Sequence, residues 1–389
     1  MSDWKEYKLG DLTIDGKGSY GIAASAIEFD ASKYTYLRIT DINDDGTINK
    51  NGLKSVDDVN ASNYLLKPND IVFARTGASV GRSYFYDGKD GEFVYAGFLI
   101  KFGIDPNKVN PKILKYYTHS QPYYDWILSV DNGATRGNIN AQMYSSMPII
   151  LPERNIQDKI VSILSSLDDK IDLLHRENKT LEAMAETLFR KWFIEEAKED
   201  DMCLLGEVIK TTSGGTPSRK NEEYYCNGNI EWVKSKELHH SYILDTEEKI
   251  TIEAVHNSSA KLLPENSILI AMYGATVGEY GIIAKSMTCN QAICALIPNE
   301  KYPYTYLYLW AKFMQDEFIN LACGAAQQNI SQELIKQQYV SNDIKLISDF
   351  HILVNPYMEK MKVNQEQIQT LTQQRDSLLP KLMSGEVKI

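Results

Sequence analysis

The sequence has no long apolar run, no strongly basic segment and no pair of cysteines at metal-binding spacing. Its five cysteines contain no C-x-x-C arrangement, which argues against a disulfide framework and favours reduced thiols without a metal site. No stretch approaches the roughly 18 apolar residues that span a bilayer, and the first residues, "MSDWKEYKLG", lack the apolar core of a signal peptide. We therefore expect a cytoplasmic protein that neither crosses a membrane nor binds a metal ion.

Positive charge is also scarce. The formal net charge is −11, and residues 151–202 are the most acidic segment for their length. Proteins that coat nucleic acid are usually basic, so the overall charge does not support a nucleic-acid role, and any such surface must be a local basic face. The length of 389 residues, with 43% hydrophobic and 24% charged residues, suits two folded domains with connecting helices.

What the sequence does contain is a duplication. "TGASVG" at 76–81 returns as "YGATVG" at 273–278, within longer similar windows at 70–86 and 267–283. Neither loop is followed by the lysine of a Walker A motif or opens a helix, so we interpret both as tight turns between strands and not as phosphate-binding loops. A repeat at this distance predicts two copies of one domain.

Other paired segments extend the duplication over most of the chain. The clearest pairs are "YLRITDI" with "WVKSKEL", "LLKPNDIVFA" with "KLLPENSILIA", and "NGATRGNI" with "ACGAAQQNI". Short runs rich in Tyr, Ile and Val, such as "DIVFAR" and "SILIAMY", predict strands. Residues 111–127 and 304–322 each predict a helix, at the same place in each copy. Each copy is therefore expected to be an α+β domain.

A long heptad helix is expected after each copy. Apolar residues follow steps of four and three over more than four heptads in the first helix, and the same period returns in the second with one Asn and one Arg in the seam. A narrow apolar stripe with acidic flanks favours pairing with another helix over lying on a membrane. The first seam comprises Ile160, Leu164, Leu167, Ile171, Leu174, Asn178, Leu181, Ala185, Leu188 and Trp192. The second comprises Phe350, Val354, Tyr357, Met361, Asn364, Ile368, Leu371, Arg375, Leu378 and Leu382.

The predicted fold class is α+β, with two tandem domains related by a pseudo-twofold axis and separated by two long antiparallel coiled-coil helices. The expected boundaries are 1–150 and 201–342 for the two domains, and 151–200 and 343–389 for the two helical segments. A duplicated chain can close into such an object only if its two equivalent helices run antiparallel.

The two seams also predict a register. A polar residue in a seam is costly unless it is paired, so we expect Asn178 opposite Asn364. About 32 shared residues, at a rise of 1.5 Å each, predict a helix pair of roughly 50 Å. The other layers then include Ile171 with Leu371, Trp192 with Phe350, and Leu167 with Arg375, whose guanidinium we expect in water.

Two α+β domains, each followed by a heptad helix, resemble the specificity subunit of a type I restriction–modification enzyme. The resemblance covers essentially the whole chain. Its most specific segments are "GGTPS" at 214–218, "YLRITDINDDG" at 36–46, and the paired "RTGASVG" and "YGATVG" loops. Singly these motifs are weak, but in this order and repeated they are specific. One departure is that Arg75-Thr76 in the first copy becomes Met272-Tyr273 in the second.

The resemblance implies a non-catalytic, sequence-specific DNA-binding subunit in which each domain reads one half of a split double-stranded target. It also implies that the helices set the gap between the halves and dock two methyltransferase subunits, to which two restriction subunits can be added. S-adenosylmethionine would be bound by the adenine-methylating subunits, and ATP and Mg²⁺ by the restriction subunits, with no cofactor in this chain. The acidic central helix and "LFRKWF" at 188–193 are the expected docking surface.

Candidate DNA contacts fall in three kinds of segment. The loop "SGGTPSRK" at 213–220 offers free backbone N–H groups, hydroxyls and cations suited to phosphate oxygens. Arg38 and Thr40, like Lys234 and Lys236, are expected on alternate positions and so on one face of a strand. The polar runs near the end of each copy supply Arg, Asn and Gln, which suit guanine and adenine. The candidates are Tyr20, Arg38, Thr40, Arg75, Thr76, Ser79, Arg82, Arg136, Asn138, Asn140, Thr216, Ser218, Arg219, Lys220, Lys234, Lys236, Tyr273, Gln327, Gln328 and Asn329.

Each of these segments also has a purely structural interpretation: a Gly-Pro turn with solvated cations, an ordinary solvent face of a strand, or a polar loop before a helix. Two other functions stay open, an atypical adenine methyltransferase and a coiled-coil scaffold whose duplicated heads bind proteins. The nearest match to a methyltransferase motif, "NPYM" at 355–358, lacks a second proline and lies inside the second seam. Binding of S-adenosylmethionine by the isolated chain would favour the methyltransferase, whereas a steep salt dependence of DNA binding would argue against the scaffold.

Overall fold

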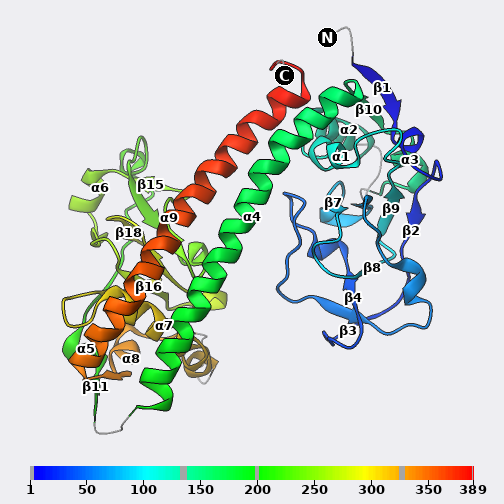
Figure 1. Cartoon of the computed structure of the whole chain (residues 1–389). Coiled ribbons are helices and arrows are strands. Elements are labelled where there is room, and N and C mark those ends of the chain that lie inside the picture. The colour runs from blue at the N-terminus through cyan, green and yellow to red at the C-terminus, as the bar shows by residue number, and fades with distance from the viewer. Residues whose placement is uncertain (1–3, 132–137, 198–200, 324–328, 388) are drawn as a thin grey trace. The chain divides into compact units, whose positions relative to one another are not determined.

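The computed structural model describes residues 4–131, 138–197, 201–323, 329–387 and 389. The chain divides into two compact units: unit 1 comprises residues 1–170 and 371–389, and unit 2 comprises residues 171–370. Each unit contains a head of strands and short helices, which we call head 1 and head 2. Each also contains part of two long helices, α4 (Arg154–Arg190) and α9 (Ile344–Met383) (Figure 1).

Head 1 is built on two four-stranded sheets. The first has the strand order β2 (Ser19–Tyr20), β9 (Leu99–Gly103), β6 (Asp70–Ala74) and β7 (Ser83–Tyr86). The second has the order β3 (Ala26–Ile27), β5 (Lys54–Val56), β4 (Tyr34–Leu37) and β8 (Phe93–Tyr95). Strands β4 and β8 run parallel. A separate antiparallel pair precedes α4 and consists of β1 (Lys5–Lys8) and β10 (Pro148–Leu151).

Head 2 repeats this arrangement, which confirms the duplication. Its first sheet has the order β12 (Lys210–Ser213), β19 (Ile293–Ile297), β16 (Ile268–Ala271) and β17 (Tyr280–Ile283), with β14 (Tyr242–Ile243) as an added fifth strand. The second sheet has the order β15 (Lys249–Ile250), β13 (Ile230–Val233) and β18 (Thr288–Cys289), and it keeps the parallel pair, β13 with β18. The antiparallel pair that precedes α9 consists of β11 (Met202–Leu204) and β20 (Tyr339–Ser341).

The central strand of each first sheet is buried on both faces. In β6, Ile71 and Phe73 belong to one apolar core, while Val72 and Ala74 belong to another. The residues of "ILIA" in β16 divide between two cores in the same way. Side chains alternate across a strand, so a continuous apolar run is what a strand between two cores requires.

The helices that follow these strands differ between the heads. Head 2 has one helix, α7 (Tyr304–Cys323), as predicted. The helix expected at 111–127 in head 1 is instead two, α1 (Pro111–Tyr117) and α2 (Gln121–Asp131). Pro122 explains the break, because proline has no N–H to donate and is tolerated only in the first turn of a helix. The shorter helices are α3 (Ala141–Ser145) in head 1 and α5 (Leu205–Val208), α6 (Ile252–His256) and α8 (Gln332–Lys336) in head 2.

In unit 2, the last part of α4 pairs antiparallel with the first part of α9, in the predicted register. The Asn364 side-chain amide donates a hydrogen bond to Asn178 Oδ1 (2.8 Å). Fourteen residues later in α4 and fourteen residues earlier in α9, the rings of Trp192 and Phe350 lie 6.0 Å apart. Two contacts with the same sum of residue numbers establish both the direction and the register.

The apolar stripe of α4 drifts near its end. Phe189 and Phe193 are the buried positions there, whereas Leu188 and Trp192 of the predicted seam are only partly buried. A helix of 3.6 residues per turn drifts relative to a 3.5-residue repeat, and a π-helical turn at Lys191–Glu195 follows at this point. Because the two rings belong to the core of unit 2, they are not available as the docking residues predicted in "LFRKWF".

In unit 1, the first part of α4 lies with the last part of α9 in one apolar core. Ile160 and Leu164 of α4 share that core with Leu382 of α9 and with Ile113 of α1. Ile171, the third predicted helix-pairing residue, is the first residue of unit 2 and is buried, with 8% of its surface exposed. No helix in the described ranges has both the length and the apolar character needed to cross a bilayer.

Candidate nucleic-acid interface

The two glycine loops are tight turns between strands, as predicted. "TGASVG" connects β6 to β7, and "YGATVG" connects β16 to β17, each through a single 3-10 turn. Gly77 and Gly274 have positive φ angles of 72° and 69°, a backbone conformation in which a side chain causes strain. The geometry of the turn therefore explains why glycine occupies both positions.

Each turn contacts the polar run at the end of its head. Thr76 forms an antiparallel bridge with Asn138, and Tyr273 forms the same bridge with Asn329. The structure therefore brings together two segments that the sequence indicated separately, and it does so in both heads. Three further candidates lie outside the described residues: Arg136, Gln327 and Gln328.

Two candidates near these turns have structural roles instead. Ser79 is only 8% exposed, because its turn folds back on itself with the Arg82 N–H donating to the Ser79 carbonyl (3.0 Å). Asn140 begins α3, where its side-chain oxygen accepts a hydrogen bond from the Met143 N–H (2.9 Å). This is the usual role of an asparagine at a helix N-terminus. Both residues thus have a role within the fold, and contact of either side chain with DNA stays a prediction.

Arg38 and Lys234 do not lie on strands, which corrects the prediction of a polar strand face. Strand β4 ends at Leu37 and β13 ends at Val233. Each basic residue instead precedes a 3-10 turn, Ile39–Asp41 in head 1 and Ser235–Glu237 in head 2. Thr40 and Lys236 lie exposed inside these turns.

A carboxylate three residues further along explains both turns. Asp41 accepts a hydrogen bond from the Arg38 N–H (2.8 Å), and Glu237 accepts one from the Lys234 N–H (2.8 Å). Such local bonds compete with the strand ladder and end the strand. Asp41 also binds the Arg38 guanidinium through Nε (2.9 Å) and Nη2 (2.6 Å), and these bonds raise the pKa of Arg38.

In head 2, acidic side chains compensate the predicted phosphate-binding cations. Glu248 accepts two hydrogen bonds from the Arg219 guanidinium (2.6 and 2.7 Å) and also pairs with Lys234. The bonds from Arg219 and then Lys234 lower the pKa of Glu248 to about 2. Lys236 pairs with the adjacent Glu247 (2.6 Å). The three cations lie close together, as a DNA-binding face requires, but each forms an ion pair with Glu247 or Glu248.

The two glycine N–H groups of "SGGTPSRK" are not free, which corrects the prediction at these positions. The Gly214 N–H donates to the Ile293 carbonyl (3.3 Å), and the Gly215 N–H donates to the Cys289 carbonyl (2.9 Å). A Cβ on Gly214 would lie 2.1 Å from the Cys289 oxygen, and one on Gly215 would lie 2.3 Å from the Ser259 carbonyl carbon. The glycines are therefore needed for close backbone packing. The exposed side chains of the loop are Thr216, Ser218, Arg219 and Lys220.

Sequence reasoning missed the residues that hold this loop. The Tyr225 hydroxyl donates to the Pro217 carbonyl (2.6 Å), and the Arg219 guanidinium lies 4.3 Å from the centre of the Tyr225 ring. Thr216 donates a hydrogen bond to Gln291. Tyr225 and Gln291 lie in segments without a motif, so no signal in the sequence identifies them.

The candidates of head 1 include a cation–ring pair. The Arg75 guanidinium lies 5.0 Å from the centre of the Tyr20 ring. Arg82, by contrast, pairs with Asp44 (2.6 Å) and donates to the Ile42 carbonyl (3.1 Å). Among the candidate cations that the structure describes, those for which it provides no carboxylate partner are Arg75 and Lys220.

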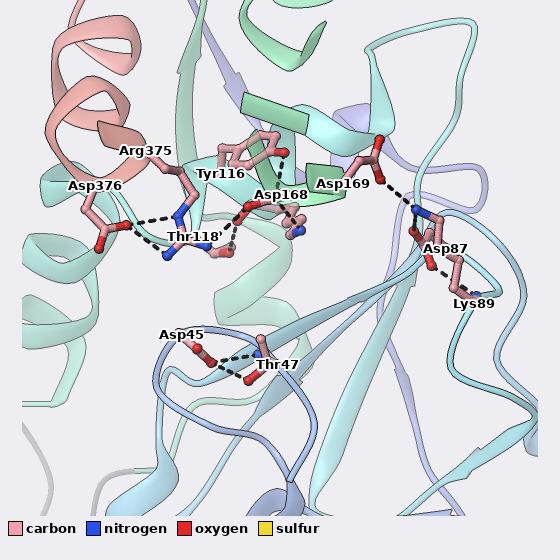
Figure 2. Close-up of polar contacts among 11 residues, drawn as sticks. Asp45, Thr47, Asp87, Lys89, Tyr116, Thr118, Asp168, Asp169, Arg375 and Asp376 are labelled. Atoms are coloured by element: carbon pink, nitrogen blue, oxygen red, sulfur yellow. Dashed lines mark hydrogen bonds and ion pairs between the residues drawn. The ribbon is translucent and has the colours of Figure 1, made fainter. Parts of the chain in front are cut away.

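Sequence reasoning also missed a charged cluster in unit 1. Asp168 of α4 accepts hydrogen bonds from Lys115 Nζ (2.7 Å) and the Tyr116 hydroxyl (2.9 Å) of α1, and from Arg375 Nη1 (3.1 Å) of α9 (Figure 2). Burial alone would raise the pKa of Asp168, but these three partners lower it. The Arg375 guanidinium is therefore bonded to an acid and not solvated as predicted. An arginine in a heptad seam was the one signal for this cluster.

Cys203, Cys226, Cys289 and Cys294 are free thiols. Burial is the main cause that raises the pKa of Cys289 and of Cys294 to about 12, so both stay protonated and unreactive at neutral pH. Over the described ranges, no group of three or more His, Cys, Asp or Glu side chains is placed to hold a metal ion.

Comparisons with known proteins agree with this architecture. Residues 1–183 and 199–341 match the sequence model of a family described as "Type I restriction modification DNA specificity domain". The chain is 25% identical to the type I restriction enzyme HindI specificity subunit of Haemophilus influenzae, with 100% of both chains covered. It is 26% identical to the MjaIX specificity subunit of Methanocaldococcus jannaschii, over 74% of this chain and 71% of that one. The S subunit of M. genitalium has a similar fold, with a TM-score of 0.61 and 17% identity over 98% of this chain and 96% of that one.

Proposed function

Because the chain belongs to the type I restriction-modification DNA specificity family, we propose that each of its heads reads one half of a split DNA target. The chain is a specificity subunit with two recognition domains and is itself non-catalytic. One observation carries the proposal. In both heads the turn after the central strand is bridged to the polar run, Thr76 with Asn138 and Tyr273 with Asn329. We assign base reading to this repeated pair of segments.

Phosphate contacts are proposed for three cations of head 2. Arg219, Lys234 and Lys236 in head 2 are gathered around Glu247 and Glu248. DNA phosphates would take the place of these carboxylates, since an arginine fork binds both kinds of oxygen. The exchange costs the loss of one set of ion pairs, which lowers affinity for DNA of any sequence and leaves discrimination to the base contacts.

We propose further that this chain assembles with two methyltransferase subunits and two restriction subunits on double-stranded DNA in the cytoplasm. S-adenosylmethionine would be held by the methyltransferase subunits, and ATP and Mg²⁺ by the restriction subunits. The acidic central helix offers a docking face, on which Leu173 is 49% exposed and Met184 is 45% exposed. The buried rings Phe189 and Phe193 are excluded from it.

The decisive experiment is to produce the chain together with a cognate methyltransferase subunit and to map methylated adenines across a genome. A split sequence with a fixed gap is the expected result, and it should vanish when the specificity chain is left out. Methylation without a defined sequence, or a continuous unsplit site, would contradict the proposed function. S-adenosylmethionine bound by the isolated chain would favour an enzyme instead.

A further inference from the structure

The two heads differ at one equivalent position of the candidate interface. Arg75 follows β6 in head 1, and Met272 follows β16 in head 2. The Arg75 N–H donates to the Phe98 carbonyl (3.1 Å), and its own carbonyl accepts from the Ile139 N–H (2.9 Å). Met272 makes the same two backbone bonds with the equivalent residues (2.8 and 2.9 Å). The backbone frame is thus the same, but Met272 is 2% exposed and packed into a core, whereas the Arg75 side chain is only partly buried.

The Arg75 guanidinium is oriented without being neutralised. It lies over the Tyr20 ring at 5.0 Å, and the Tyr20 hydroxyl is fixed by a hydrogen bond from the Ala141 N–H (3.1 Å). The Nε atom of Arg75 is buried, and the residues that the structure describes provide it with no hydrogen-bond partner. Within the described part of the chain no carboxylate pairs with this guanidinium, whereas Arg38 and Arg82 of the same head each bind an aspartate.

We propose that Arg75 is the residue of head 1 that reads a guanine, by donating two hydrogen bonds to its O6 and N7 atoms in the major groove. This inference rests on the proposed function. A guanidinium is a planar fork of donors, and guanine presents two adjacent acceptors that match it. Contact with the Tyr20 ring restricts the guanidinium before DNA arrives, which reduces the conformational entropy lost on binding. A buried donor without a partner is costly, and a ligand that supplies acceptors relieves that cost.

The half-site of head 2 must be read differently, because Met272 cannot supply this contact. The exposed neighbour there is Tyr273, which is 44% exposed, with Asn329 beside it. The two halves of the target are therefore expected to differ in sequence, and a guanine recognised by Arg75 belongs to one half only.

The test compares the wild-type complex with Arg75→Lys, Arg75→Ala and Tyr20→Leu variants, each made with the methyltransferase subunit, by mapping methylated adenines. Arg75→Lys keeps the charge but loses the fork. We expect both Arg75 variants to lose roughly 5- to 150-fold of the discrimination for one guanine, in one half-site. Tyr20→Leu should lose less at the same base. A control in the same head, Lys17→Ala, removes an exposed cation outside the candidate interface and should leave that base preference intact.

The outcomes separate the two proposals. If the wild type modifies a split sequence but the Arg75 variants keep an unchanged sequence preference, the guanine assignment is overturned while the proposed function stands. The assignment is equally overturned if Arg75→Lys retains full discrimination, because a point charge would then suffice. If the wild type modifies no split sequence, the proposed function fails and the assignment fails with it. Unfolding midpoints of each variant exclude misfolding as the cause of a lost preference.

Discussion

Head 1 and head 2 share one backbone plan but hold their cations differently. In head 1 each of two arginines has an acid of its own, Arg38 with Asp41 and Arg82 with Asp44. Head 2 instead joins its cations through shared acids, as Glu248 binds both Arg219 and Lys234. Arg38 and Lys234 follow equivalent strands, β4 and β13. The fold therefore fixes the backbone position of such a residue, whereas its acidic partner differs between the heads. Recognition surfaces can then diverge without loss of the core.

The helical parts of the two units differ in a similar way. In unit 1, the charged cluster around Asp168 joins the head to both long helices, in addition to the apolar core that they share. Unit 2 uses a cluster of aromatic rings, in which Phe350 lies 5.8 Å from Phe189 and 5.2 Å from Phe193. The first type of contact depends on pH and salt, and the second depends on packing. Each can be disturbed separately.

Exchanging a whole head should have the largest effect. Replacement of residues 203–340 by the equivalent residues of another family member should change one half of the DNA target completely and leave the other half as it was. The reason is that each head has its own sheets and its own core. Adenine methylation mapping measures the outcome, with the unaltered chain as control. A change in both halves would refute independent reading.

Lengthening both helices tests whether they set the gap between the two half-sequences. One heptad inserted into each of α4 and α9 preserves the seam and adds about 10 Å of helix at 1.5 Å per residue. The gap between the two half-sequences should grow by roughly 3 base pairs at 3.4 Å each, and both half-sequences should stay the same. An insertion of four residues, which breaks the heptad repeat, is the control and should impair assembly. An unchanged gap would show that the helices do not set it.

Removing a large side chain from the aromatic cluster should weaken unit 2. Phe350→Ala deletes a ring that is fully buried, and such changes cost about 3–5 kcal/mol of unfolding free energy. The matched change in unit 1 is Leu164→Ala, with an expected cost of about 2–5 kcal/mol. Urea unfolding followed by limited proteolysis assigns each loss to a unit. Equal destabilisation of both units by either variant would mean that they do not unfold separately.

A smaller loss of unfolding free energy is expected for Asp168→Asn in unit 1. The change leaves Lys115 without its acid and Arg375 with Asp376 alone. Because Lys115 is partly exposed and Arg375 keeps a partner, we expect a cost of about 2 kcal/mol, less than for a fully buried pair. The folded pKa of Asp168 lies below its ordinary value. Its contribution is therefore complete above the unfolded pKa and is lost as the pH falls through the folded one.

The pH dependence gives the sharper test of this cluster. Below a pH of about 3.8, the ordinary value for an aspartate, the wild type should lose stability that Asp168→Asn has already lost, so the two unfolding curves should converge. Glu182→Gln in unit 2, where Glu182 binds Lys312 (2.9 Å), serves as the comparison and should leave unit 1 unaffected. Curves that stay parallel on acidification would rule out an ionised Asp168 as the source of the difference.

The smallest effect concerns the acids that hold the cations of head 2. Glu248→Gln removes the charge that Arg219 and Lys234 share, so both should become available to phosphates. Affinity for DNA of arbitrary sequence should rise, and the slope of log K against log salt should steepen by roughly one to two units. Asp41→Asn, which releases Arg38 alone, should steepen it by about one. Fluorescence anisotropy at several salt concentrations measures both, and unchanged slopes would place these cations away from DNA.

Much of the fold could be predicted from the sequence because it depends on periodic patterns. The "IVFA" and "ILIA" runs, the heptads, and the single Asn in each seam each imply one arrangement, and the Asn178–Asn364 contact confirms the register. The candidate site was less predictable, because its geometry depends on partners far along the chain. The residues around Arg219 in the sequence do not predict its ion pair with Glu248. Those around Gly215 do not predict its hydrogen bond to the Cys289 carbonyl. Short-range acids, such as Asp41 after Arg38, also ended strands that the apolar pattern extended.

The composition of unit 1 has a consequence for how the chain is made. Its core includes Leu9 and Ile113 from the start of the chain together with Leu382 and Met383 from the end, whereas unit 2 is one continuous segment, residues 171–370. A ribosome adds about 5–20 residues per second, so the first head emerges on the order of 10–40 s before the segment that completes its core. Head 2 is finished in between. A message cut short after residue 370 would therefore yield a complete second unit. In the first unit, Ile160 and Leu164 would be exposed to solvent, because Leu382 and Met383 would be missing. Quality-control proteases can recognise such a product.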